Sequence, residues 1–281
     1  MRTLFLGAGQ IGRSTAAALV EPPGTVEVPW EDPVAAGAAI EEGVARFLSE
    51  SDGQPWAVCW SAGKGIVGTP RAAFDVELGH LRRALATVEA AAGPVRAGGR
   101  LVLASSAGGL HAGDGAGVVT EASVPTPVSE YGRHKLRQEQ LVTGFAAATG
   151  VPCLLARISN VYGPGQDMRK PQGFISHMCG AMLRRDGFVL SVPPDTIRDF
   201  VFGADVGGRL AAWIDADRTS PPGTAVVKLV VSGRSTTLHE VIAVVRAVVR
   251  VPARITIDSL APGGDQPLRT RFRSTTLAWL L

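Results

Sequence analysis

The amino-acid sequence predicts an α/β protein with a doubly wound parallel sheet. Short apolar runs alternate with amphipathic helical patterns through residues 3–157, and this alternation is typical of that class. A glycine-rich turn at residues 7–12 joins the first apolar run to the first helical pattern. The chain has 281 residues, of which 46% are hydrophobic and 19% charged, so it can bury one large core.

The amino-terminal elements follow from the apolar pattern and from the residues that interrupt it. Residues 3–6 form an apolar run that predicts a buried strand, and the helix formers at residues 13–20 end at a Pro-Pro-Gly stop. Residues 25–30 alternate between apolar and polar side chains and predict a second strand. Residues 34–48 predict a helix with one apolar face, and the apolar residues 56–60 predict another buried strand.

The central elements continue the alternation. Residues 74–88 carry apolar side chains at steps of four and three, which is typical of an amphipathic helix. Strands are predicted at residues 100–104 and 151–157, with a helix at residues 131–148 between them. Because each strand is followed by a helix, we expect the strands to run parallel.

The interval between Gly12 and Trp56 is short for a nucleotide-binding half. It holds one helix, one strand and one further helix. A complete half needs two strands in this interval, each with its own crossover. The sequence therefore predicts that one βα unit is missing here.

Charge, apolar run length and cysteine content exclude several classes of protein. The net charge is +3 and no run of Lys or Arg exceeds two residues, so we expect no nucleic-acid partner. The apolar runs fall short of the roughly 18 residues that a membrane span needs, so we expect no membrane partner. Cys59, Cys153 and Cys179 are unclustered, which predicts no metal site and favours a cytoplasmic, reducing compartment.

The glycine turn predicts a dinucleotide site. Gly7 permits the tight turn, Gly9 lets a pyrophosphate approach the backbone, and Gly12 lets helix and strand pack closely. The strand before the turn and the helix after it favour this interpretation over a purely structural turn. We therefore expect cofactor contacts here, including Gln10 and Ile11.

Tyr131 and Lys135 predict an acid/base pair. They are four residues apart on a predicted helix, so the ammonium lies beside the phenol and favours its ionised form. The chain has two tyrosines and four lysines, which favours a functional pair over a coincidence on a surface helix. Ser106, at the mouth of a strand, is placed to hydrogen-bond the same reacting oxygen. Its alternative role is to cap a loop.

Further motifs complete a family pattern. Asn-Val-Tyr-Gly-Pro-Gly at residues 160–165 follows a strand, and Arg-Asp-Phe-Val-Phe stands at residues 198–202. Together with the glycine turn and the Tyr-Lys pair, these motifs resemble the extended short-chain dehydrogenase/reductases. Within them, the sequence is most similar to the NAD-dependent nucleotide-sugar epimerase/dehydratases, of the UDP-sugar 4-epimerase kind. The resemblance extends to Gly-Asp at residues 264–265 and Leu-Ala-Trp at residues 277–279.

The resemblance implies roles for particular side chains. Tyr131 is then the catalytic acid/base, Lys135 tunes it and holds the nicotinamide ribose, and Ser106 is the catalytic serine. Ser61 and Ala62, which follow a predicted strand, are then cofactor contacts. The implied cofactor is NAD, with NADP not excluded, because the acids near the second strand do not match the family's adenosine site.

Two further residues are implied to bind the substrate. Asn160 would contact the nucleotide-sugar phosphate, and Arg198 the diphosphate, to which its planar fork is suited. Alternatives remain for both. In the alternative interpretation, Asn160 only stabilises the loop before Tyr162, and Arg198 forms an ion pair with Asp199 or Asp205.

Some positions depart from the family pattern. His111 lies on a glycine-rich loop, where we expect an exposed or substrate-packing role ahead of acid/base catalysis. A late arginine of the family is absent, and Arg269 or Arg271 is a candidate substitute.

The expected function is therefore that of a nucleotide-sugar-modifying enzyme, a 4-epimerase that acts through a 4-keto intermediate. An NAD(P)H-dependent ketoreductase or dehydratase and a non-catalytic dinucleotide-binding protein are the alternatives. We expect a Rossmann-like domain at residues 1–165, to which residues 198–217 return, and a substrate region at residues 166–197 and 218–281. The resemblance also implies a homodimer, formed through the helices at residues 74–89 and 131–148.

Overall fold

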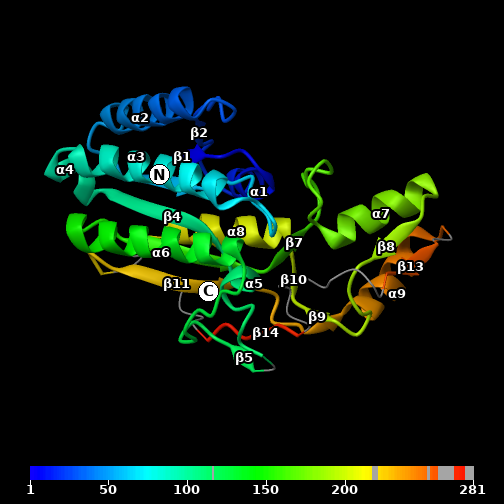
Figure 1. The fold of residues 1–281 in the computed structure, drawn as a ribbon. Helices are drawn as coiled ribbons and strands as arrows, with labels where there is room; N and C mark the ends of the chain where they lie inside the picture. The colour runs from blue at the N-terminus through cyan, green and yellow to red at the C-terminus, as the bar shows by residue number, and fades with distance from the viewer. Residues whose placement is uncertain (116, 217–220, 252–253, 259–268, 276–281) are drawn as a thin grey trace.

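The computed structural model describes residues 1–115, 117–216, 221–251, 254–258 and 269–275. Its main body is a six-stranded sheet in the order β11-β6-β4-β3-β1-β2, and all neighbouring strands in it are parallel. Helices cover both faces, and a smaller region lies to one side of the main body (Figure 1). This architecture confirms the predicted doubly wound α/β class.

The elements of the main body alternate along the chain as the sequence predicts. The sheet strands are β1 (Arg2–Leu6), β2 (Gly24–Thr25), β3 (Trp56–Trp60), β4 (Gly99–Ser106), β6 (Cys153–Ile158) and β11 (Ala225–Val230). The helices are α1 (Gln10–Ala16), α2 (Pro33–Glu50), α3 (Arg71–Ala90), α4 (Gly93–Ala97), α5 (Ala107–Leu110), α6 (Glu130–Thr149) and α8 (Gly203–Asp215).

The smaller region consists of α7 (Phe174–Arg184), α9 (Leu238–Val249) and the paired strands β8 (Phe188–Leu190) and β13 (Ile255–Ile257). Three further two-stranded ladders lie between it and the main body or along the body's edge. They are β7 (Asn160–Tyr162) with β10 (Phe200–Phe202), β9 (Ile197–Arg198) with β12 (Thr236–Thr237), and β5 (Val118–Val119) with β14 (Arg271–Phe272).

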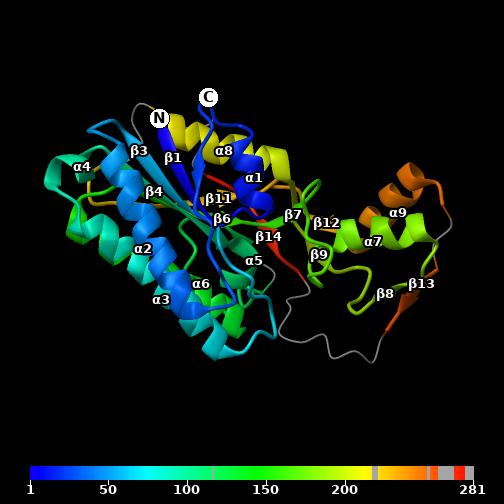
Figure 2. The same ribbon diagram turned by 90° about the horizontal axis from the view of Figure 1, so that it is seen from above.

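Two core layers follow from the alternation of side chains along the strands. Leu4, Val58 and Leu101 point to the face that α2, α3 and α6 cover, whereas Phe5 and Cys59 point to the face that α8 covers. Figure 2 shows these layers, with α1 and α8 on one side of the sheet and α2, α3 and α6 on the other. The sheet is thus buried on both faces, which explains the continuous apolar runs in its strands.

The missing βα unit is confirmed at the outer edge of the sheet. Only β2 lies beyond β1, and only α2 connects β2 to β3 in this fully described interval. The prediction of a strand over residues 25–30 is wrong beyond Thr25. β1 ends at Leu6, one residue beyond the Phe5–Thr25 pair, so little of it remains for this segment to pair with, and Val26 packs instead against Gly43 of α2. The segment ends at Asp32, which caps α2 by accepting from two backbone amides.

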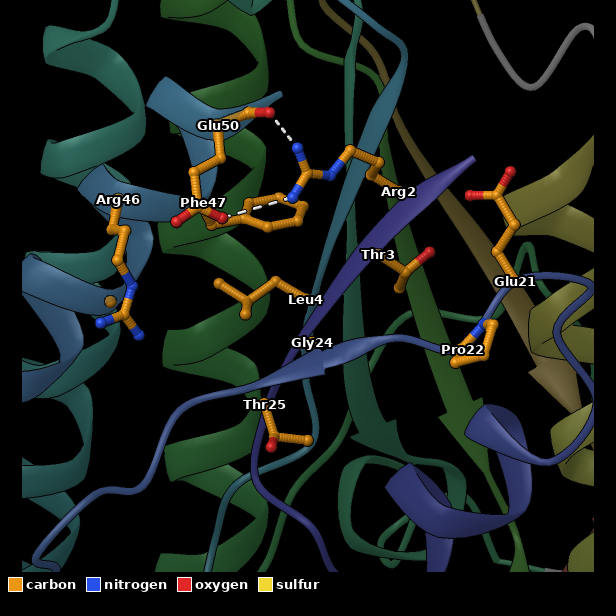
Figure 3. A pocket seen from close by; sticks show the side chains of 11 residues that line it. Arg2, Thr3, Leu4, Glu21, Pro22, Gly24, Thr25, Arg46, Phe47 and Glu50 are labelled. Atoms are coloured by element: carbon orange, nitrogen blue, oxygen red, sulfur yellow. Dashed lines mark hydrogen bonds and ion pairs between the residues drawn. The ribbon is translucent and has the colours of Figure 1, made fainter. Parts of the chain in front are cut away.

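The space beside this shortened edge forms a surface pocket of about 410 Å³ (Figure 3). Arg2, Thr25 and Glu50 are among its lining residues, and Arg2 is hydrogen-bonded to Glu50 across one wall. The pocket lies at the amino end of β1, whereas parallel α/β sheets bind ligands at the carboxyl ends of their strands. We therefore look for the functional site at the carboxyl ends of the strands.

The division of the chain into two functional regions remains a prediction. The sequence division placed residues 218–281 in the substrate region, whereas β11 is the edge strand of the central sheet, paired with β6. Within the described residues, the structure contains no helix that is long and apolar enough to cross a membrane.

Candidate active site

The glycine turn lies at the carboxyl end of β1 and is fastened to the loop after β3. Gly7 has a φ of +108°, and a side chain there would overlap the backbone of Ala62. The Ser61 hydroxyl donates to the Gly7 carbonyl at 2.6 Å. Gly9, in contrast, is exposed, and a Cβ added to it would meet no atom within 4 Å. The turn is therefore packed underneath and open above, which fits the diphosphate of a dinucleotide.

The other predicted cofactor residues surround this turn. Gln10 begins α1, and its side-chain amide donates to the carbonyls of Gly163 and Pro164 at 3.1 and 3.3 Å. Gly12 and Ile11 lie in the same first helical turn, and Ala62 is buried against the turn. The structure thus brings the predicted residues of α1 and of the β3 loop together. Their contacts with a cofactor remain predictions.

Ser106 and Tyr131 meet where α5 and α6 touch. The Ser106 hydroxyl accepts from the Gly109 amide at 3.1 Å and so caps α5. A Cβ added to Gly109 would lie 2.8 Å from the Tyr131 ring and 3.2 Å from the Ser106 Oγ. A Cβ on Gly132 would in turn overlap the Gly109 carbonyl. These two glycines let the helices approach closely enough to place the serine and the tyrosine side by side.

Lys135 is buried, and its ammonium is held on the strand that carries Ser106. It donates to the Ala104 carbonyl at 3.3 Å and to Gln138 Oε1 at 3.0 Å. The Gln138 amide then donates to Glu77 Oε1 at 2.9 Å, and His134 Nε2 lies 3.0 Å from the same oxygen. Burial raises the pKa of Glu77, but the contacts with His134, Lys135 and Gln138 outweigh it and hold that pKa below its ordinary value.

Sequence reasoning missed Glu77 and Gln138. Both are polar residues on amphipathic helices, where a polar side chain is usually solvated. A signal was present for Gln138, because it lies three residues after Lys135 and so on the same helical face. No local signal showed that Glu77 on α3 faces α6.

A second buried network joins β4, α6 and β6. Arg157 on β6 forms a bidentate ion pair with Glu139 on α6, with closest atoms 2.7 Å apart, and Ser105 also donates to Glu139 at 2.6 Å. The Arg157 guanidinium lies 3.1 Å from His111 Nε2, and His111 Nδ1 lies 2.7 Å from Asp114. A guanidinium only donates, so Nε2 must accept and Nδ1 must carry the proton.

The expectation that His111 is exposed or packs on substrate is therefore wrong. Its side chain is only 1% exposed and bridges Arg157 and Asp114 as a neutral imidazole. Burial is the main cause that lowers its pKa, and the hydrogen bond with Asp114 opposes this effect. The loop pattern suggested exposure because its glycines concealed the short helix α5, which turns His111 inward.

Arg198 differs from Arg157 in having no acidic partner among the described residues. Its guanidinium donates only to the carbonyl of Ile197, at 3.0 Å, and no ion pair forms within the described residues. Burial lowers its pKa to about 10. The alternative of a pair with Asp199 is wrong, because that carboxylate accepts from Ser159 and Ser232 instead. The alternative pair with Asp205 is also not formed.

Asn160 joins β7 to β10. Its side-chain amide donates to the Asp199 carbonyl at 2.8 Å, which supports the alternative role of stabilising the loop. The side chain is nevertheless exposed, so a substrate contact remains a prediction. The motifs at residues 264–265 and 277–279 lie outside the described residues. The backbone of Arg269 bridges Ile197, which places Arg269 on the strand face opposite to Arg198.

Comparisons with known proteins show the family and the fold of the chain. A sequence model described as the NAD dependent epimerase/dehydratase family matches residues 6–227. The chain is 33% identical over 91 residues to a dTDP-L-rhamnose 4-epimerase of Burkholderia thailandensis, which is 32% of this chain and 25% of that protein. It is 31% identical over 107 residues to a putative UDP-glucose 4-epimerase of Methanocaldococcus jannaschii. That match covers 38% of this chain and 35% of that protein. The match thus spans about a quarter of the length of the first relative and about a third of the length of the second.

Solved structures share the fold over nearly the whole chain. A UDP-glucose 4-epimerase from Thermotoga maritima, solved with UDP-glucose, has a TM-score of 0.79 at 21% identity, covering 99% of this chain and 91% of that one. A UDP-glucose 4-epimerase from Thermus thermophilus, solved with NAD, has a TM-score of 0.73 at 22% identity, covering 97% and 90%. At these identities the likeness shows a common fold.

Proposed function

The chain belongs to the NAD dependent epimerase/dehydratase family, and from this we propose that it is a nucleotide-sugar 4-epimerase that acts through a 4-keto intermediate. The observation that carries the proposal is the pairing of two features. Ser106 and Tyr131 both lie close to Gly109, Lys135 is anchored on the strand that carries Ser106, and the half-buried Arg198 has no acidic partner among the described residues. The first feature supplies proton transfer, and the second needs an anion such as a diphosphate.

Tyr131 is the proton-transfer group. As a phenolate it takes the proton of the sugar C4 hydroxyl, and as a phenol it returns that proton after the sugar has turned. The Ser106 hydroxyl accepts from the Gly109 amide, so its own proton is available for the reacting oxygen. The Lys135 ammonium is fixed on the Ala104 carbonyl, on the strand that carries Ser106.

The residues of the glycine turn would hold the dinucleotide. The open space above Gly9 admits a diphosphate, and Gly7 and Gly12 keep the turn close to Ser61 and Ala62. When bound, NAD supplies the hydride acceptor and donor that oxidation and reduction at C4 require. The shortened outer edge of the sheet leaves Asp32 occupied as a helix cap and Glu31 paired with Lys64.

The decisive experiment is turnover without added cofactor. Purified protein incubated with UDP-glucose or a related UDP-sugar should form the 4-epimer, detected by proton NMR. Tyr131→Phe should reduce this rate about a thousandfold, because it removes the acid/base, while the circular dichroism spectrum stays unchanged. Turnover that consumes added NADH stoichiometrically would instead indicate net reduction of a ketone. Mass analysis of the released cofactor identifies NAD or NADP.

We also expect a homodimer through α3 and α6, which light scattering of the purified protein tests.

A further inference from the structure

The segment between β7 and α7 bonds to both segments that flank the proposed dinucleotide site. Residues 163–173, here called the strap, leave β7 and rise between α1 and α7 (Figure 1). At the start of the strap, the Gln10 side-chain amide donates to two of its carbonyls, at 3.1 and 3.3 Å. Farther along, the Lys170 ammonium donates to the Gly63 carbonyl at 3.2 Å. The strap therefore joins the helix after the glycine turn to the loop after β3.

Arg13 brings the strap against the glycine turn itself. Its guanidinium donates to the carbonyl of Ala8, in the middle of the turn, and to the carbonyl of Gly165 in the strap, the latter at 2.7 Å. On the other side, Gly63 directly follows Ala62, which packs beneath the turn. The strap is thus bonded on both sides of the turn, and it crosses the edge of the sheet where the turn is open.

The bonds that hold the strap are made by the chain itself, and they are few. His177 on α7 lies with Nε2 2.6 Å from the Lys170 carbonyl, which ties the strap to the smaller region. Within the strap, the Gln166 amide donates to the Gln172 carbonyl at 3.2 Å. No residue of the strap is buried. A segment held by a few accessible hydrogen bonds and no buried side chain opens far more readily than the core does.

We propose that Gln10, Arg13 and Lys170 are positioning residues that hold the strap closed across the glycine turn, so that the dinucleotide exchanges only when these bonds open. The inference rests on the proposed placement of NAD at this turn. A 4-epimerase ends each cycle with its cofactor in the starting oxidation state and needs no exchange, whereas a reductase must exchange its cofactor at every turnover. A strap that is closed most of the time therefore suits the epimerase.

A strap of this kind leaves a kinetic signature. If the cofactor enters and leaves only while the strap is open, the rates of entry and release both scale with the open fraction. Weakening the bonds of the strap then raises the two rates together, and their ratio, the Kd, stays the same. Loss of a direct contact with the cofactor would instead raise the release rate and the Kd in step.

The test measures release and affinity of NAD in Gln10→Ala and Lys170→Met. Protein loaded with NAD is mixed with an excess of isotope-labelled NAD, and mass spectrometry follows the replacement of the bound cofactor. Equilibrium dialysis gives the Kd. Each variant should release NAD about tenfold faster than the wild type, because hydrogen bonds to or from the strap are lost, while the Kd stays within about twofold.

Arg169→Met is the matched control for Lys170→Met. Arg169 is the neighbouring cation of the strap, its side chain is 92% exposed, and its ion pair with Asp167 stays within the strap. The control therefore removes a charge of the same sign without cutting a bond to the turn or to the loop after β3. It should release NAD at the wild-type rate.

Two results would overturn the inference while the wild type binds NAD. One is an unchanged release rate in both variants, and the other is a Kd that rises in step with the release rate. Circular dichroism checks that the variants are folded, and Arg13→Met replaces Gln10→Ala if the latter is not. If the wild type binds no NAD in dialysis, the placement of NAD at the turn fails and the strap fails with it, which is a distinguishable result.

Discussion

Two arginines, Arg157 buried and Arg198 half-buried, show how the same side chain is used in two ways. Arg157, in the network behind Tyr131, is paired bidentately with Glu139 and also contacts His111. Arg198, on the ladder beside the smaller region, hydrogen-bonds only the Ile197 carbonyl within the part of the chain that the structure describes. The first network is complete without a ligand and holds β4 and β6 against α6. The second is incomplete, and we interpret it as a binding site. Partnership, more than burial, distinguishes structural charges from functional ones.

The largest expected effect comes from breaking the complete network. Arg157→Met leaves the Glu139 carboxylate buried without its cation, and this should cost about 3–5 kcal/mol of unfolding free energy. Urea denaturation followed by circular dichroism measures the loss. Adding Glu139→Leu to the variant removes the stranded charge and should restore part of the stability. Equal stability of Arg157→Met and the wild type would show that the network is not structural.

The matched change in the incomplete site should have the opposite character. Arg198→Met removes a cation that no acid of the described residues compensates, so the unfolding free energy should not fall. Binding of UDP should weaken about a hundredfold, because a guanidinium contact with phosphate is lost. Calorimetry and denaturation on the same preparation check both parts. A loss of stability as large as that of Arg157→Met would contradict the distinction.

The contrast between these arginines also marks what sequence reasoning could reach. The parallel sheet, the glycine turn and the missing βα unit follow from spacing along the chain, and the structure contains each of them. It also places Tyr131 and Lys135 on one helix, as their spacing predicts. Whether residues 25–30 form a strand depended on how far the neighbouring strand β1 extends, and it ends at Leu6. The burial of His111 depended on Arg157, 46 residues away. Arg198 has no acidic partner among the described residues, and the acids next to it in the sequence gave no sign of this. Pattern cannot show such pairings.

A smaller effect should follow from the contact between α5 and α6. Gly109→Ala places a methyl group 2.8 Å from the Tyr131 ring, which must move, and overpacking of this kind costs about 1–3 kcal/mol. The rate of epimerisation should fall along with the stability. Gly108→Ala is the matched control, because a Cβ there meets no atom within 4 Å on the same short helix. If both variants turn over equally, the contact does not position Tyr131.

The smallest effect concerns pH. Burial lowers the pKa of His111 from its ordinary 6.5, so the unfolded chain takes up the proton first as the pH falls. Above pH 6.5 both states are neutral and this residue adds no pH dependence. Between pH 6.5 and the lowered pKa, the wild type should lose up to about 1.4 kcal/mol per pH unit. His111→Asn should lose less over the same interval, as urea denaturation at each pH would show, and parallel slopes would be contrary evidence.

The central claim, a 4-keto route on a nucleotide sugar, is tested most directly by turnover in D₂O. The account predicts that a UDP-sugar and its 4-epimer interconvert while the hydrogen on C4 remains protium, since that hydrogen leaves and returns within the closed site. In the proton NMR spectrum of the recovered product, the signal of the hydrogen on C4 should then have its full intensity. Deuterium at C4, or no interconversion by protein that is folded and binds UDP, would contradict the account.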